Sequence, residues 1–256
     1  MEAGNQKPIH VVFFDLGNTL VYSQGHTRAR LRQAAGRMAT RLRGMGCDIQ
    51  KTELTNLLLT TITDYHKRRD SDLFEITTEK LLIDALLETK SCNVAQEQVA
   101  AGLESYYGFT QSLWVPEEDV LETFSALEQA GLRLGLISNA GYAWDVHCLI
   151  DKCKIRHFLS QITISAEVGV RKPHPDIFNQ ALRALKCKPQ NALMVGDNLI
   201  ADILGADKLG MHTAWLSRRA DPQQVKSAGK WIVPQFEIQS LLELPALIAA
   251  HNRDAE

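Results

Sequence analysis

The sequence predicts an α/β fold, a doubly wound, Rossmann-like parallel sheet with an all-helical domain inserted after its first strand. A short apolar run at residues 11–14 is bounded by turn residues, which is typical of a strand buried inside a parallel sheet. Residues 27–107 show helical spacing without a strand pattern. From residue 114 onward strand and helix patterns alternate, and such alternation implies right-handed crossovers with helices on both faces of the sheet.

The first predicted strand runs directly into Asp15, and Gly17 and Asn18 follow as residues suited to a sharp turn. A carboxylate at this point lies at the carboxyl edge of the sheet, where α/β proteins keep their active sites. Capping a turn or the start of a helix is the alternative role for Asp15. This stretch alone leaves both roles open, and the rest of the chain favours catalysis.

The inserted segment, at about 85 residues, is too long to be a loop, so we expect a small helical domain over the carboxyl edge of the sheet. Its expected helices span residues 27–44, 51–69, 78–89 and 94–109. The domain boundaries that follow are 23–111 for the helical domain, and 1–22 together with 112–256 for the α/β core.

Four further strands are predicted after the insert, with a helix between each consecutive pair. Glycines such as Gly131 and Gly210 lie where these helices should end. In the tail, residues 231–249 contain a short apolar piece and a helix interrupted at Pro245. The expected strands span 132–139, 161–165, 192–195 and 212–216, and the expected helices span about 117–130, 142–153, 175–186 and 199–209.

Composition excludes several classes of protein. The chain has 256 residues, 45% of them hydrophobic, which suffices for a sizeable core, and its net charge of −2 offers no surplus for binding nucleic acid. No stretch approaches the roughly 18 apolar residues of a membrane span, and the start of the chain lacks the apolar run of a signal peptide. Five scattered cysteines argue against a disulfide framework. We therefore expect a cytoplasmic protein without membrane or nucleic-acid partners.

Polar side chains end three of the predicted strands. Asp15, Ser138 and Asp197 each lie at such an end, Lys172 lies in the loop after another strand, and Asp202 follows five residues after Asp197. Because parallel strand ends converge on one crevice, these groups should lie together. Carboxylates suit Mg²⁺, and one carboxylate could act as a nucleophile that forms an aspartyl-phosphate. Each residue alone is ordinary, since a single lysine is usually solvated and a single serine usually caps a helix, but the ordered set is specific.

Four segments in this order resemble the motifs of the haloacid dehalogenase (HAD) superfamily of hydrolases. They are residues 14–20, 136–139, 167–178 and 195–202. The helical insert after the first of them resembles the C1-type cap of that family.

The resemblance implies a role for each acidic and basic residue. Asp15 would be the covalent nucleophile and Lys172 would balance the charge. The Asp15 carboxylate, the Gly17 carbonyl and the Asp197 carboxylate would bind Mg²⁺, with Asp202 supporting the metal through its water shell. The cofactor expected from the resemblance is therefore Mg²⁺.

The resemblance also implies a phosphate-binding set that consists of Asn18, Thr19, Ser138 and Asn139. The expected function is a Mg²⁺-dependent phosphatase that acts on a small phosphorylated metabolite through an aspartyl-phosphate.

Gly17 departs from the family pattern, because phosphatases of the family carry a second Asp at this position for proton transfer. Glycine keeps the carbonyl but cannot move a proton, and such acid–base help contributes about 10²–10⁴-fold. Hydrolysis of esters with poor leaving groups should be weakened. Tyr22, His26 or His66 are candidates to replace the missing acid. Asn18, in the next position, tolerates the left-handed backbone that the turn needs.

Two alternatives to the phosphatase remain open from the sequence. The first is a dehalogenase- or phosphonatase-like hydrolase, whose relatives also lack the second Asp. Dehalogenases need no metal, however, and lack the pair formed here by Asp197 and Asp202. The second is a non-enzymatic module that binds a phosphate ligand or has a regulatory role. Retention of Asp15, Lys172 and Asp197 together argues against loss of activity.

Overall fold

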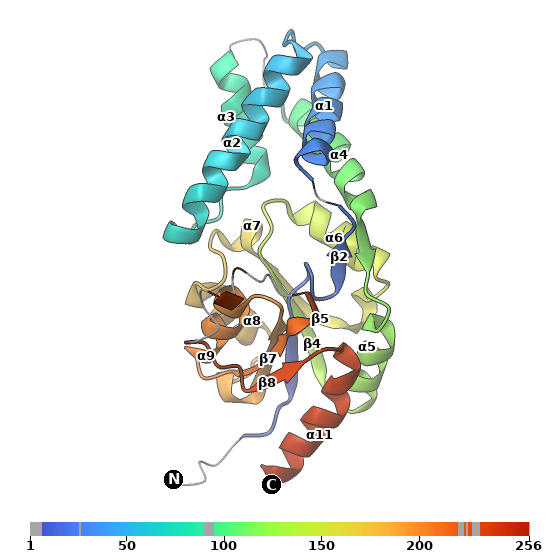
Figure 1. Cartoon of the computed structure of the whole chain (residues 1–256), viewed down its shortest axis with the longest axis vertical. Helices are drawn as coiled ribbons and strands as arrows, with labels where there is room; N and C mark the ends of the chain where they lie inside the picture. Colours follow the sequence, from blue (N-terminus) through green and yellow to red (C-terminus); the bar gives the residue numbers. More distant parts are fainter. Residues whose placement is uncertain are drawn as a thin grey trace.

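The computed structural model describes residues 7–25, 27–89, 95–219, 223, 225–226 and 231–255. A parallel sheet of six strands has the order β5-β4-β1-β6-β7-β8, and Figure 1 shows this sheet with helices around it. The strands are β1 (Val11–Phe14), β4 (Arg133–Ser138), β5 (Leu159–Ile164), β6 (Ala192–Gly196), β7 (His212–Leu216) and β8 (Phe236–Ile238). This arrangement confirms the predicted α/β class.

The strand β8 is an addition to the prediction, which treated its residues only as a short apolar piece. It has three residues and pairs in parallel with β7. A strand this short carries too little periodicity to be recognised locally. It is recognised as a strand only through its pairing with β7, which ends at Leu216, 20 residues before β8 begins at Phe236.

Helices cover both faces of the sheet because successive residues of a strand point to opposite sides. In β1, Val12 and Phe14 belong to a core cluster with α5, α6 and α11, whereas Val11 and Phe13 belong to a second cluster with α8 and α9. The helices of this part are α5 (Val120–Gln129), α6 (Ala143–Lys152), α7 (Ser165–Val168), α8 (Pro175–Ala184), the π-helix η4 (Leu199–Leu204), α9 (Gly205–Asp207) and α11 (Leu244–Asp254).

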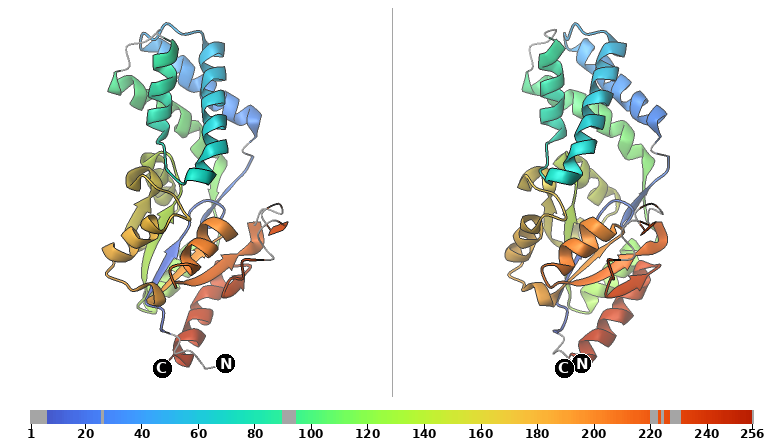
Figure 2. Two further views of the ribbon diagram at one scale, coloured as in Figure 1. Left: turned by 90° about the vertical axis from the view of Figure 1, so that its left-hand side faces the viewer. Right: turned by 60° about the vertical axis from the view of Figure 1, so that its left-hand side comes forward.

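The insert forms a separate bundle of four helices between two short strands. β2 (Val21–Ser23) and β3 (Trp114–Pro116) pair in antiparallel fashion at its base. The helices are α1 (Arg28–Gly44), α2 (Lys51–Asp72), α3 (Thr78–Thr89) and α4 (Gln96–Thr110). They pack around a core cluster of their own. Figures 1 and 2 show this bundle at one end of the molecule and the C-terminal helix α11 at the other.

The segment between α2 and α3 connects the bundle to the sheet domain a second time. The Glu75 amide donates to the Gly169 carbonyl at 3.0 Å, and the Arg171 amide donates to the Leu73 carbonyl at 3.0 Å. The Thr78 amide donates to the Gly141 carbonyl at 2.8 Å. This contact, which we call the linker clamp (residues 73–78 against 141 and 169–171), was not predicted from the sequence.

The cysteines differ from the expectation at one position. Cys148, Cys153 and Cys187 are free thiols, whereas Cys47 is disulfide-bonded, and Cys92 lies outside the described residues. An odd number of cysteines excludes complete pairing but does not exclude a single bond, so the count was too weak an argument. None of the helices in the described ranges is both long enough and apolar enough to cross a membrane.

Candidate active site

Strand register places the predicted site residues side by side. Phe14 lies opposite both Leu136 of β4 and Val195 of β6. Asp15, Ser138 and Asp197 come one or two residues later and therefore leave the sheet at one edge. The Asp15 amide donates to the Val195 carbonyl at 2.9 Å, which continues the pairing to the point where the chain turns away.

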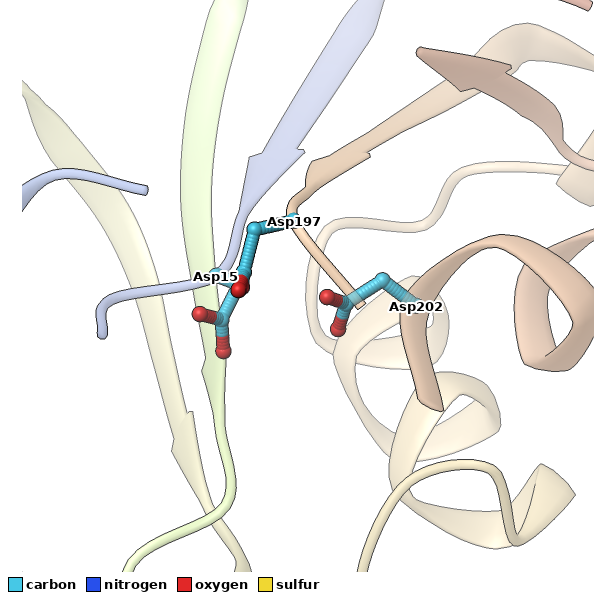
Figure 3. A group of neighbouring side chains, drawn as sticks. All are labelled: Asp15, Asp197 and Asp202. Carbon is cyan, nitrogen blue, oxygen red and sulfur yellow. The ribbon is translucent and has the colours of Figure 1, made fainter. Parts of the chain in front are cut away.

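Three carboxylates converge at this edge, as Figure 3 shows. Oxygens of Asp15, Asp197 and Asp202 all lie within 4.8 Å of one another. Asp202 comes from η4 and folds back beneath the end of β6, where its Oδ2 accepts a hydrogen bond of 3.0 Å from the Asn198 amide. A Cβ atom on Gly196 would lie 2.2 Å from that oxygen, so only glycine at this position leaves room for the carboxylate.

Lys172 lies buried in the middle of this cluster. Its Nζ donates to Asp15 Oδ1 at 2.6 Å and to the Ile137 carbonyl at 2.6 Å, and lies 2.7 Å from Asp202 Oδ1. Burial by itself lowers the pKa of Lys172, but the charges of Asp15 and Asp202 outweigh it and raise that pKa. The ammonium group therefore stays charged and compensates two carboxylates.

Asn139 holds the main chain of Lys172 in place. Its Oδ1 accepts a hydrogen bond of 2.7 Å from the Lys172 amide, and its Nδ2 donates to the Lys172 carbonyl at 2.9 Å. Both polar atoms of the Asn139 side chain are thus hydrogen-bonded to the main chain of Lys172. Its expected role in phosphate binding stays a prediction, and the observed contact makes Asn139 a support for the lysine.

The donor set fits a hard divalent cation. Burial, reinforced by the charges of Asp15 and Asp202, raises the pKa of Asp197 to about 8. Burial also raises the pKa of Asp202 to about 6, against the stabilising charge of Lys172. No ion pair of the Asp197 carboxylate occurs among the described residues. Clustered oxygens with this excess of negative charge match the ligand preference of Mg²⁺.

The turn after Asp15 has the predicted backbone conformation, but the side chains of Asn18 and Thr19 lie in different environments. Asn18 adopts the left-handed conformation, with φ of 56°, and its amide donates to the Val21 carbonyl at 2.6 Å. The Asn18 side chain is exposed to solvent, whereas Thr19 is fully buried and its Oγ1 has no hydrogen-bond partner. The structure therefore does not bring the side chains of Asn18 and Thr19 together.

A cavity of about 310 Å³ opens beside the acidic cluster, between the sheet domain and the helical bundle. Gly17, Ser138 and Asn139 line it from the sheet domain. The bundle contributes residues of α2 and α4, which sequence analysis did not place at the site, apart from His66. This side of the cavity includes Tyr65, His66, Arg69, Tyr106 and Tyr107.

The candidates to replace an acid at position 17 lie in different places. His66 lines the cavity. Tyr22 lies instead on a separate part of the surface. The Arg219 guanidinium stacks over the Tyr22 ring, with its Cζ 3.8 Å from the ring centre. His26 lies outside the described residues.

A buried ion pair next to Lys172 was missed by sequence analysis. Arg171 donates to Glu75 Oε2 at 3.2 Å, and both side chains are less than a tenth exposed. Ser165 donates to the same oxygen at 2.6 Å, and the Tyr65 hydroxyl donates to Glu75 Oε1. Glu75 lies 90 residues or more from Ser165 and Arg171 in sequence, so no local pattern indicates the pairing.

The arrangement of strands, carboxylates and lysine has clear relatives among known proteins. The sequence pattern of the haloacid dehalogenase-like hydrolases matches residues 9–210. The glyceraldehyde 3-phosphate phosphatase of Methanopyrus kandleri is 31% identical over 249 residues, which cover 96% of this chain and 100% of that protein.

Two solved structures share the fold. A HAD phosphatase from Thermococcus onnurineus has a TM-score of 0.63 and 22% identity, covering 94% of this chain and 98% of that one. A 2-haloacid dehalogenase from Pseudomonas syringae has a TM-score of 0.63 and 23% identity, covering 94% of this chain and 99% of that one. At these identities the likeness concerns the fold alone, whereas the sequence match covers most of the chain. This chain belongs to the haloacid dehalogenase-like hydrolase family.

Proposed function

We propose that this hydrolase is a Mg²⁺-dependent phosphatase of small phosphorylated metabolites, with Asp15 as its covalent nucleophile. The observation that carries the proposal is the contact of Asp15 with buried Lys172, beside the carboxylates of Asp197 and Asp202. The Methanopyrus kandleri relative, which is aligned along nearly the whole chain, is named a glyceraldehyde 3-phosphate phosphatase. That name supports a phosphate ester of a short carbon chain as the substrate.

The Mg²⁺ ion would be held by the carboxylates of Asp15 and Asp197 and by the Gly17 carbonyl. Asp202 would act through water, because its two oxygens already contact Lys172 and the Asn198 amide. When bound, the ion would neutralise phosphate oxygens and orient the ester for in-line attack.

The side chains of the site would carry out the other steps of the reaction. An oxygen of Asp15 attacks phosphorus, the bond to the ester oxygen breaks, and water later releases phosphate from the carboxylate. Lys172 offsets the charge of Asp15 and of the transferring group. Ser138, at the cavity wall, would bind phosphate oxygens, and Asn139 would hold Lys172 in position.

The helical bundle would serve as the cap, with residues 23–111 as one domain and residues 1–22 with 112–256 as the other. The bundle supplies one wall of the cavity. Selection among phosphorylated metabolites would therefore depend on side chains of α2 and α4.

Phosphate release from a panel of phosphomonoesters tests the proposal. We expect release that requires Mg²⁺, stops in the presence of a chelator and is lost in Asp15→Asn, while Asp151→Asn, on the exposed end of α6, remains active. Turnover that persists with chelator, or in Asp15→Asn, would contradict the mechanism.

Two other results would favour the alternatives. Chelator-insensitive release of halide from 2-haloacids would indicate a dehalogenase. Stabilisation by phosphate esters without any turnover would indicate a binding module, because a ligand stabilises a folded protein by RT ln(1 + [L]/Kd) whether or not it reacts.

A further inference from the structure

The ester oxygen that leaves phosphorus needs a proton when the alcohol is a weak acid. Asp15 is the nucleophile of the proposed reaction, and Lys172 is held between Asp15 and Asp202. Gly17 has no side chain. A proton donor for the leaving group therefore has to come from the wall of the cavity.

Asp145 is an acid in that wall. It lies in the first turn of α6 and lines the same cavity as Gly17 and Ser138. Its Oδ1 accepts a hydrogen bond of 3.0 Å from Gln111 Nε2, and the described part of the chain offers it no other hydrogen bond and no ion pair. Its second oxygen is thus uncommitted.

Asp145 and Trp114, the residue that a Cβ atom at position 17 would meet, are both held by the segment of residues 111–114. A Cβ atom on Gly17 would lie 3.5 Å from Trp114 Cη2. Gln111, which holds Asp145, comes three residues before Trp114. Lys152 of α6 donates to the carbonyls of both Gln111 and Trp114, which fixes Trp114 and the helix of Asp145 in one wall.

The other acidic groups of the cavity are less suited to donate a proton. Glu75 is engaged by Arg171, Ser165 and Tyr65. Burial raises the pKa of Tyr106 to about 12 and raises the pKa of Tyr107 as well, so neither phenol exchanges protons near neutral pH.

The surroundings of Asp145 shift its carboxyl toward the protonated form. Burial raises the pKa of Asp145 to about 6, against the hydrogen bond from Gln111. The titratable groups that face it are Tyr106 and Tyr107 from α4, with Tyr142 and Cys148 from its own segment. None of these carries a charge at neutral pH, because burial raises the pKa of each of them.

We propose that Asp145 is the general acid that protonates the leaving alcohol, and that its carboxylate then accepts a proton from the attacking water. This inference rests on the proposed phosphatase activity. In the first step the phosphorus–ester oxygen bond breaks, and the Asp145 proton passes to that oxygen to give the free alcohol. In the second step water bonds to phosphorus, the bond to Asp15 breaks, and the water proton returns to Asp145.

Leaving-group dependence tests this role. In Asp145→Asn, kcat/KM for beta-glycerophosphate should fall by about 10²-fold or more, whereas kcat/KM for para-nitrophenyl phosphate, whose leaving group needs no proton, should change by less than about threefold. Asp151→Asn is the matched control, because Asp151 lies on the same helix, is exposed and pairs with Arg156. It should leave both values unchanged.

The pH profile gives a second readout. Above pH of about 6 the carboxyl of Asp145 loses its proton, so kcat/KM of the wild type for beta-glycerophosphate should decline there more than kcat/KM for the aryl ester. Asp145→Asn should remove this difference. Introducing Gly17→Asp into Asp145→Asn should restore turnover of beta-glycerophosphate, since a Cβ atom at position 17 would make only ordinary van der Waals contacts.

The outcomes separate the two proposals. An unchanged ratio of the two kcat/KM values in Asp145→Asn overturns the role of Asp145, whether both values fall equally or neither falls. Wild-type protein that releases no phosphate from either ester, or releases it independently of Asp15, overturns the phosphatase proposal and the inference with it.

Discussion

Charge balance at the carboxyl edge of the sheet depends on one residue, Lys172. It is the cation that contacts Asp15 and Asp202, and all three groups are almost fully removed from water. Taking ions out of water is unfavourable unless each charge has a close partner. The stability of the site in the absence of metal therefore depends on this ammonium group.

Lys172→Met should destabilise the metal-free protein by about 3–5 kcal/mol, since one partner of a buried ion pair is removed. Addition of Mg²⁺ should recover part of this loss, because the ion would offset the same carboxylates. Urea unfolding with chelator and with Mg²⁺ measures both effects. Lys188→Met, at an exposed position, should change the free energy of unfolding by no more than about 0.5 kcal/mol, and a similar result for Lys172→Met would refute the charge-balance argument.

The turn after β1 illustrates how a single residue type satisfies a backbone requirement. Asn18 has φ of 56°, which few residues other than glycine adopt. The left-handed conformation of Asn18 could be predicted from the sequence, because it depends only on residues of the turn itself. The same turn places Gly17 against Trp114, where a Cβ atom would make an ordinary van der Waals contact of 3.5 Å.

Among the elements, the linker clamp joins the helical bundle to the loop that carries Lys172. Glu75 pairs with Arg171, the residue before Lys172, and the two main chains are bonded on either side of that pair. The position of the bundle and the position of the lysine are thereby linked through adjacent residues. The clamp lies at the edge of the cavity, which both Glu75 and Arg171 line.

Glu75→Gln should loosen this clamp, because Arg171 would be left as a buried charge without its counter-ion. We expect a loss of about 3 kcal/mol in the free energy of unfolding, together with faster hydrogen exchange at the amides of Glu75 and Arg171. Hydrogen exchange followed by mass spectrometry localises the effect. Glu53→Gln, on the exposed face of α2, is the control, and equal exchange in both variants would show that the clamp does not restrain the linker.

Across the whole molecule, a second group of charges joins the start of α5 to the C-terminal part of the sheet domain. Arg218, directly after β7, donates to Asp119 Oδ2 at 2.6 Å and to Oδ1 at 3.0 Å. Ser240 and the Leu241 amide also donate to Asp119, at 2.8 and 2.9 Å. Asp119 thus connects the start of α5 to two segments about 100 and 120 residues later.

Asp119→Asn should lower stability in a pH-dependent way. Burial raises the pKa of Asp119, but the hydrogen bonds from Arg218, Ser240 and Leu241 outweigh it and hold the pKa below its usual value. A carboxyl with a lowered pKa stabilises the folded state above its unfolded pKa, and this contribution is lost as the pH falls below about 3.9. The variant should be about 1–3 kcal/mol less stable than the wild type at neutral pH.

The difference between Asp119→Asn and the wild type should shrink as the solution is acidified to pH 3. Thermal unfolding across this pH range tests the sign of the dependence. Glu118→Gln, at the exposed neighbouring position, should show no such trend. A difference that grows on acidification would mean that Asp119 is not held in its ionised form.

Much of the fold follows from local physical chemistry. Apolar periodicity located the strands β1, β4, β5, β6 and β7, because the residues of a strand between helix layers are buried on both faces regardless of distant detail. The helices of the insert were predicted to within a few residues at each end, since helical spacing and caps lie within the segment itself. Polar residues at strand ends indicated the edge at which Asp15, Asp197 and Asp202 meet.

Other features were decided only by tertiary structure, because they join segments that no sequence window contains. β8 exists through its pairing with β7, and η4 is a π-helix whose Asp202 folds beneath Gly196. The side-chain amide of Asn139 binds the main chain of Lys172, 33 residues away.

Asp145 was passed over in the sequence because an acid in the first turn of a helix is ordinary there. Burial in a cavity shared with Ser138 and Gly17 raises its pKa to about 6. Which residues end the strands could be predicted from the sequence, since burial and periodicity act locally. Tertiary packing decided which polar side chains are buried next to one another. Their pKa values follow from this burial and from the charges beside them.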